Sequence, residues 1–210
     1  MIIDAPDGWY SRGYLPHLNV QGQLQFITFR LADSLPQQVL AQMHIELAQL
    51  PEIKRERERR QKIEQWLDAG LGCCALQHPR MAEVMQQTLQ KFAGERYHLL
   101  AWCIMPNHVH VLIDAVGSLP KIVQSWKSYT GRWAIAHNAE LGLSVPGTQL
   151  WMREYWDRFI RDEAHFHTTV EYIHNNPIKV GLCVNGIDWL WSSASLVQNT
   201  AAFKARFWNE

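Results

Sequence analysis

The amino-acid sequence predicts an α+β fold in which one antiparallel sheet carries helices on one face. Predicted strands and predicted helices alternate along the chain. The strands are rich in β-forming residues with alternating apolar positions, and the helices are longer. Two of the strand-like segments are joined by the pair Pro106–Asn107, which is typical of a tight turn between antiparallel neighbours. The chain has 210 residues, of which 47% are hydrophobic and 19% charged, so it is long enough to bury a core.

The first half of the chain reads as one strand followed by helices. Alternation and β-branched or aromatic residues predict the strand, and Ser34 stands where a side chain could cap the first helix. The second helix alternates in charge sign, which favours a solvated face over a DNA contact. The expected elements are a strand at 23–33 and helices at 34–50, 51–70 and 78–94.

The second half alternates strands and helices. Asp162 is expected to cap the last helix, and Pro177 to stop it. The expected elements are strands at 97–105 and 108–114, a helix at 119–142, a strand at 155–161 and a helix at 163–176. This order resembles the ferredoxin-like (RRM-like) plan, and we expect a single domain over residues 1–210 that ends in a tryptophan-rich tail at 181–210.

Composition restricts the function classes and the compartment. The chain carries 20 basic and 20 acidic residues, so any contact with nucleic acid must depend on local patches of charge. Its four cysteines include no CxxC pair, which makes a cysteine zinc site an unlikely interpretation and favours free thiols in a reducing compartment. Neither a signal peptide nor a membrane-spanning apolar run is visible, so we expect a cytoplasmic protein of the bacterial cytosol or nucleoid.

His108 and His110 are separated by a single valine in a strand-like segment. Because side chains alternate along a strand, the two imidazoles are expected on one face, and both could reach one metal ion. The spacing alone is equally compatible with two polar residues on a wet face. A second such pair, His165 and His167, falls on a predicted helix, where residues two apart diverge by about 200°, and we interpret it as surface.

A candidate oxygen ligand and a candidate nucleophile occur together further along. Tyr172 and Asn176 are four residues apart, which puts them on one helix face. An asparagine oxygen can coordinate a metal ion, and a phenol can act as a nucleophile. Spacing alone favours the other interpretation, with Tyr172 in the core and Asn176 as a residue of the helix end, because asparagine is common near helix ends.

Four ordered segments resemble one known family. They are CIMPNHVHVLI (103–113), WDRFIRDEAHF (156–166), YIHNNPIKVGL (172–182) and DWLWSSA (188–194). Together they resemble the REP-associated tyrosine transposases, single-tyrosine transposases of the HUH endonuclease superfamily. The resemblance extends from about residue 9 to residue 195 and is far more specific than the histidine pair alone.

The resemblance implies a role for each motif. His108 and His110 match the histidines of the HUH motif, Tyr172 matches the nucleophilic tyrosine, and Asn176 matches the third metal ligand. Two other tyrosines could be rivals, but Tyr129 is followed four residues later by Trp133, and Tyr155 by Phe159. Neither rival therefore has a ligand-type residue one helical turn away.

The implied activity is metal-dependent cleavage and rejoining of single-stranded DNA beside hairpins (REP-like palindromes), through a 5′-phosphotyrosine. The expected cofactor is Mg²⁺ or Mn²⁺, and the expected state is a monomer, with a dimer possible. The helices within 51–94 exceed the compact core of the family, so we treat part of them as an insertion. Candidate phosphate contacts are Lys127, Arg132, Arg153, Arg158, Arg161 and Lys179.

Two alternatives remain open on the sequence. One is a catalytically silent protein that binds hairpin DNA on the same fold. The other is a metal-dependent hydrolase that uses water as its nucleophile. Trp126, Trp133 and Trp151 could stack on bases, or they could equally pack in the core.

Overall fold

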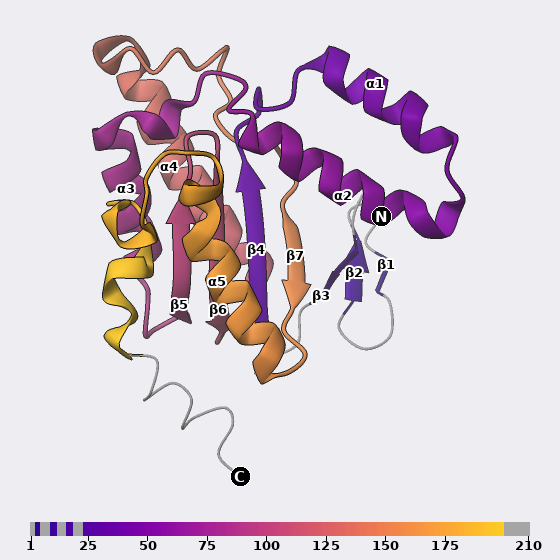
Figure 1. The fold of residues 1–210 in the computed structure, drawn as a ribbon. Coiled ribbons are helices and arrows are strands. Elements are labelled where there is room, and N and C mark those ends of the chain that lie inside the picture. The colour runs from indigo at the N-terminus through magenta and orange to yellow at the C-terminus, as the bar shows by residue number, and fades with distance from the viewer. Residues whose placement is uncertain (1–2, 5–8, 12–15, 19–22, 200–210) are drawn as a thin grey trace.

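A four-stranded antiparallel sheet forms the centre of the computed structural model, which describes residues 3–4, 9–11, 16–18 and 23–199. The strand order is β5–β6–β4–β7, with every neighbouring pair antiparallel (Figure 1). The strands are β4 (Leu24–Arg30), β5 (Tyr97–Ile104), β6 (His108–Ala115) and β7 (Trp156–Phe159). A separate small sheet contains β1 (Ile3–Asp4), β2 (Trp9–Ser11) and β3 (Pro16–Leu18). The predicted α+β class and the antiparallel sheet are confirmed.

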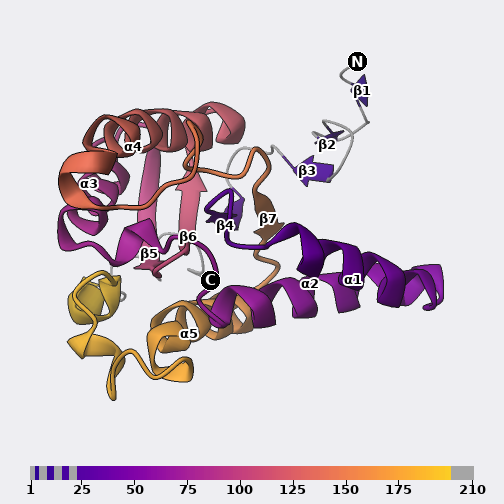
Figure 2. The ribbon, with the colours of Figure 1, turned by 90° about the horizontal axis from the view of Figure 1, so that it is seen from above.

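Helices cover both faces of this sheet, whereas the sequence placed them on one. The five α-helices are α1 (Gln37–Ala48), α2 (Glu52–Asp68), α3 (Pro79–Gln90), α4 (Leu119–Leu141) and α5 (Glu163–Lys179). Seen from above, α3 and α4 lie on one side of the sheet and α5 on the other, with the end of α2 near α5 (Figure 2). The physical reason lies in β6, where all eight residues are buried, so that both of its faces need cover.

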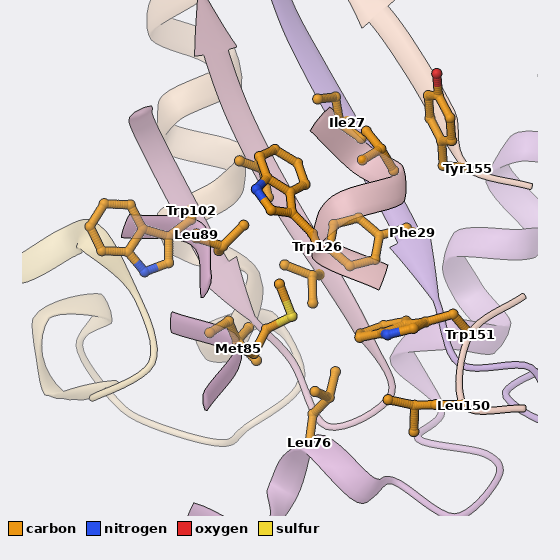
Figure 3. Close-up of a cluster of buried hydrophobic side chains, with 14 of the residues drawn as sticks. Ile27, Phe29, Leu76, Met85, Leu89, Trp102, Trp126, Leu150, Trp151 and Tyr155 are labelled. Atoms are coloured by element: carbon orange, nitrogen blue, oxygen red, sulfur yellow. The ribbon is translucent and has the colours of Figure 1, made fainter. Parts of the chain in front are cut away.

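The face under α3 and α4 is the larger apolar core. Val109, Val111 and Ile113 of β6 point into it, together with Trp126 of α4 and Met85 of α3. Figure 3 shows part of this cluster around Trp126 and Trp151. A second, smaller apolar cluster lies on the opposite face, where Phe26, Leu112 and Cys103 meet Phe166 and Ile173 of α5.

Two helix ends differ from the sequence prediction. Ser34 does not cap α1: Pro36 is the N-cap, and the Ser34 hydroxyl donates to the carbonyl of Leu31 instead. Pro177 does not stop α5, which continues to Lys179. Proline removes its own N–H and crowds the preceding turn, but it does not prevent the two residues after it from completing the last turn of the helix. The predicted cap at Asp162 is present, since its carboxylate accepts from the backbone N–H of His165 at 2.7 Å.

The region 51–94, in which we expected an insertion, contains two different kinds of element. Helix α3 packs into the main core, where Met81, Met85 and Leu89 are fully buried. Helix α2 pairs with α1 and projects with it beyond the edge of the sheet (Figures 1 and 2). Only α2 therefore has the character of an added element, and the domain boundaries stay a prediction.

The C-terminal segment runs back along β5. The backbone N–H of Trp102 donates to the Ser193 hydroxyl at 2.9 Å, and the Trp189 indole donates to the carbonyl of Ile104 at 3.0 Å. Short 3₁₀ helices occur at Ala75–Gln77, Gly186–Asp188 and Ser193–Asn199. Of the predicted tryptophan-rich tail, residues 200–210 lie outside the described residues. Across the described part of the chain, none of the helices combines the length and the apolar character needed to cross a bilayer.

Candidate metal and nucleophile site

The two histidines of β6 point to the same face of the sheet, as strand alternation predicted. His108 pairs with Arg30 of β4, and His110 pairs with Thr28. Their side chains face α5, because the His110 ring stacks on Phe26 at 5.5 Å between centroids. His108 is 1% exposed and His110 is 2% exposed, so neither is a polar residue on a wet face.

The ring nitrogens of this pair are fixed by their neighbours. His108 Nδ1 lies 2.8 Å from Asn107 Oδ1, and His110 Nδ1 lies 2.8 Å from the Thr28 hydroxyl. The two Nε2 atoms face each other at 3.0 Å. Each imidazole is thus held from behind through Nδ1 and presents Nε2 toward the other, which is the usual way in which a protein orients histidine ligands.

Electrostatics keep both imidazoles neutral. Burial and, to a smaller extent, the positive charge of Lys179 together lower the pKa of His108 to about 3. Burial also lowers the pKa of His110 well below its ordinary value, helped by His108 and by Lys179. The neutral imidazole is the form that binds a metal ion, so the protein needs no deprotonation step to offer these two ligands.

Helix α5 brings the other two predicted residues to the same place. The Tyr172 ring lies 5.3 Å from the His110 ring and 5.8 Å from the Phe26 ring, edge-on to both. Asn176, one turn later, is 1% exposed, and its amide acts on the Tyr172 phenol and lowers the pKa of that group, but neither its oxygen nor its nitrogen has a partner in hydrogen-bonding geometry among the described residues. Burying an amide without a hydrogen-bond partner costs free energy. The Asn176 amide oxygen is therefore a candidate ligand atom.

The residues present fit a divalent metal ion. Two neutral imidazoles and a buried amide oxygen without a partner form a mixed nitrogen and oxygen donor set, which suits ions such as Mn²⁺. No cluster of three or more histidine, cysteine, aspartate or glutamate side chains occurs within the described residues. The candidate centre is therefore the histidine pair completed by an amide, and it contains no carboxylate ligand of its own.

The phenol of Tyr172 is protonated in this environment. Burial raises its pKa above the ordinary value, and the negative charge of Glu64 on α2 raises it further. Burial in turn raises the pKa of Glu64. The polar contact between Tyr172 and Glu64 was not visible in the sequence, because α2 is more than 100 residues away from the tyrosine.

The rival tyrosines lie elsewhere. Tyr129 is 50% exposed on α4, and Tyr155 belongs to the apolar core on the α4 side of the sheet. Neither shares a face with His108 and His110. Sequence reasoning also missed two neighbours of the histidines, Asn107 and Thr28; the first was interpreted only as a turn residue, although its position directly before the histidine was a usable signal.

Three of the six predicted phosphate contacts gather at one pocket. Lys127, Arg132 and Arg153 line a cavity of about 330 Å³ between α4 and the segment 148–155, and no carboxylate lines it. The Lys127 ammonium also donates to the carbonyl of Arg153 at 2.7 Å. This pocket is a local cationic patch on a chain whose net charge is zero.

The other three candidates lie on the β7 and α5 side. Burial lowers the pKa of Arg158, as do the charges of Arg161 and Arg60, so these guanidinium groups are close to one another. The Lys179 ammonium forms an ion pair with Asp68 of α2 at 2.6 Å. The six residues thus form two separate basic regions and not one surface.

The tryptophans named as possible base-stacking residues belong mainly to the core. Trp126 is fully buried and Trp151 is 4% exposed (Figure 3). Trp133 is partly buried and packs against the same cluster. The indole of Trp126 donates to the Tyr97 hydroxyl, and that of Trp151 donates to the Thr130 hydroxyl. Base stacking by Trp126 or Trp151 is therefore excluded in this structure.

Residues 75–176 match the protein family described as "Transposase IS200 like". This span contains both histidines, Tyr172 and Asn176, and it leaves out α1 and α2.

Two curated relatives carry a more specific name. The chain is 22% identical over 112 residues to "REP-associated tyrosine transposase" of Escherichia coli (strain K12), a match that covers 53% of this chain and 63% of that protein. It is 24% identical over 115 residues to "Putative REP-associated tyrosine transposase" of Haemophilus influenzae, covering 46% and 58%. The matches thus span less than two thirds of either relative.

A solved structure has a similar fold. "Structure of the REP associates tyrosine transposase bound to a REP hairpin" superimposes with a TM-score of 0.53 at 15% identity, covering 89% of this chain and 84% of that chain. The resemblance drawn from the four sequence motifs is confirmed: the chain is similar to two proteins named as REP-associated tyrosine transposases, and its residues 75–176 match the family described as "Transposase IS200 like".

Proposed function

We propose that this protein is a tyrosine transposase that cleaves and rejoins single-stranded DNA beside hairpins through a 5′-phosphotyrosine intermediate. One observation carries the proposal. The Tyr172 ring lies 5.3 Å from the ring of His110, on the helix face that also presents the unpartnered amide of Asn176. The tyrosine of α5 therefore lies beside the histidine pair of β6, and the buried Asn176 amide follows it by one helical turn, which supports this assignment of roles.

His108, His110 and Asn176 would hold the divalent ion, Mg²⁺ or Mn²⁺. When bound, the ion supplies positive charge that neutralises the scissile phosphate. Burial keeps the two imidazoles neutral in the metal-free protein. Hydrogen bonds with Asn107 and Thr28 hold them in position. The donor set is compatible with either ion.

Tyr172 would carry the covalent step. Its hydroxyl oxygen forms a bond to phosphorus, the bond from phosphorus to the 3′ oxygen breaks, and the proton lost by the phenol is balanced by one that the departing 3′ oxygen takes up from solvent. The products are a 5′-phosphotyrosine and a free 3′-hydroxyl. Because burial and Glu64 raise the pKa of the phenol, the tyrosine keeps its proton in the free protein. The reverse attack by a 3′-hydroxyl rejoins DNA and needs no nucleotide cofactor.

The substrate would be single-stranded DNA next to a hairpin. The similar solved structure is described as bound to a REP hairpin, and the pocket lined by Lys127, Arg132 and Arg153 provides a cationic surface, although Arg153 also lies 4.0 Å from the Glu154 carboxylate. Arg158, Arg161 and Lys179 are proposed as further phosphate contacts nearer to α5. For Lys179 this requires that a phosphate displace Asp68 from the ion pair.

The test is adduct formation with hairpin-bearing single-stranded DNA and Mn²⁺ or Mg²⁺. Wild-type protein should form a covalent protein–DNA adduct, and Tyr172→Phe should form none. Tyr129→Phe is the matched control, since Tyr129 is exposed on α4, and it should behave like wild type. Cleavage that survives in Tyr172→Phe would indicate a hydrolase that uses water. Binding without cleavage in either metal would indicate a silent DNA-binding protein.

A further inference from the structure

Asn107, at the turn between β5 and β6, is completely buried. A turn residue on a protein surface would be solvated, whereas this side chain is enclosed between β6 and the end of α2. Its backbone also serves the sheet, because the N–H of Leu31 donates to the Asn107 carbonyl at 2.8 Å. The side chain therefore has one fixed environment.

Every hydrogen-bonding group of the Asn107 amide has a partner. Its Nδ2 donates to the carbonyl of Leu67 at 3.2 Å and to the carbonyl of Leu71 at 3.0 Å. Two carbonyls can only accept, so they require the NH₂ group on their side and force Oδ1 to face His108 Nδ1, at 2.8 Å. The orientation of the amide is thus determined by the chain at the end of α2.

This orientation fixes the tautomer of His108. Because Oδ1 can only accept, the proton of the neutral imidazole must be on Nδ1, which leaves a lone pair on Nε2. His110 is different, since the Thr28 hydroxyl at its Nδ1 can either donate or accept. His110 can therefore carry its proton on Nε2 and donate to His108 Nε2, or carry it on Nδ1 and offer its own lone pair.

We propose that Asn107 is a positioning residue of the metal site, which locks His108 as a ready ligand and takes its own orientation from the carbonyls of Leu67 and Leu71. The proposal rests on the metal site of the proposed function. His108 is the permanent ligand of the pair, and His110 is the adaptable one, which changes tautomer through Thr28 when an ion binds.

The same end of α2 is tied to the site at other points. Asp68 forms an ion pair with Lys179, and Glu64 contacts Tyr172. These residues and Leu67 precede residue 75, where the family match begins. The segment that looked like an insertion thus orients residues inside the matched region, and α2 is a working part of the site.

Two nearly isosteric variants of Asn107 test the proposal. Asn107→Leu removes both the acceptor for His108 and the donors to the two carbonyls, whereas Asn107→Asp keeps the acceptor and removes only the donors. Both should lower the melting temperature. Only Asn107→Leu should weaken Mn²⁺ binding, by about 10- to 100-fold in calorimetric titration, while Asn107→Asp should stay within about threefold of wild type.

A nitrogen NMR measurement on the metal-free protein gives a second readout. Long-range proton–nitrogen correlations should show His108 with its proton on Nδ1 in wild type and in Asn107→Asp. A wild-type His108 protonated on Nε2, or equal Mn²⁺ affinities in the Leu and Asp variants, would overturn the proposal. If wild-type protein binds no Mn²⁺, the proposed metal-dependent function fails, and the tautomer measurement still decides whether Asn107 positions His108.

Discussion

The two faces of β6 are buried to the same degree and are organised in opposite ways. Toward α3 and α4 the strand presents Val109 and Val111, which pack into an apolar cluster with Trp126. Toward α5 it presents His108 and His110, which are just as inaccessible. Burial alone therefore does not distinguish an apolar core from a functional site. The two faces differ in which of their buried polar groups lack hydrogen-bond partners.

On the α4 face the indoles of Trp126 and Trp151 are hydrogen-bonded, and the Trp102 indole N–H is the exception without a partner among the described residues. The Trp126 indole donates to the Tyr97 hydroxyl, which itself donates to the carbonyl of Leu89. On the α5 face the two imidazoles pair with each other through Nε2 atoms 3.0 Å apart, and the Asn176 amide has no hydrogen-bond partner among the described residues. Buried polar groups are normally paired, so the Asn176 amide is the group on this face that is available to a ligand.

The largest expected contrast comes from neighbouring residues of β6. His108→Ala should reduce adduct formation by about a thousandfold or more, because loss of the metal's charge on the phosphate costs several kcal/mol, and should leave a cooperatively folded protein. Val109→Ala should retain most of the cleavage activity at low temperature and lose about 1–3 kcal/mol of folding stability. Adduct assays and thermal denaturation measure both quantities; unfolding of His108→Ala would make the histidine structural.

Metal binding should stabilise the α5 face in a measurable way. With free Mn²⁺ at 100 times its dissociation constant, the folded state gains about 2.7 kcal/mol, which corresponds to about 5–10 °C in melting temperature for a chain of this size. Chelation with EDTA should reverse the shift. His108→Ala should show no such shift, and Val109→Ala should show the full one; a shift of equal size in both would place the ion elsewhere.

Much of this arrangement was predictable from short-range rules. Strand alternation put His108 and His110 on one face, and helical periodicity put Tyr172 and Asn176 on another. Both rules act over a few residues, so a single sequence is enough to apply them. The prediction that β6 and α5 bring these four residues together came from the family resemblance. Periodicity alone did not predict it.

The parts that escaped prediction depend on partners far away in the chain. Asn107 looked like an ordinary turn residue because its partners are the carbonyls of Leu67 and Leu71, about 40 residues earlier. Tyr172 meets Glu64 of α2, a helix interpreted only as a solvated face. The presence of helices on both faces of the sheet was foreseeable. Leu112 of β6 is an apolar residue on the same face as His108 and His110, so that face also needed to be covered.

Two buried asparagines sharpen the comparison further. Asn107 and Asn176 are 0% and 1% exposed, but the first has every hydrogen bond satisfied and the second has none. Replacing a fully bonded buried amide leaves its partners unpaired, whereas replacing an unpartnered one removes a penalty. In metal-free protein we therefore expect Asn107→Leu to lose about 1–3 kcal/mol and Asn176→Leu to gain about 1 kcal/mol, as measured by urea denaturation. Destabilisation by Asn176→Leu would show that its amide is already satisfied without a metal ion.

The smallest expected effects concern the cationic pocket beside α4. If Arg132 and Arg153 contact phosphates, each change to alanine should weaken hairpin DNA binding only a few-fold and reduce the slope of log affinity against log salt by about 0.7–0.9. Arg80→Ala is the matched control, since Arg80 is exposed at the start of α3 and does not line the pocket. Fluorescence anisotropy across a salt series measures the slope. Because these contacts neutralise phosphates far from the reacting atoms, the adduct rate at saturating DNA should not change. An unchanged slope in both arginine variants would remove the pocket from the DNA surface and leave that role to Arg158, Arg161 and Lys179 on the α5 side, next to the proposed chemistry.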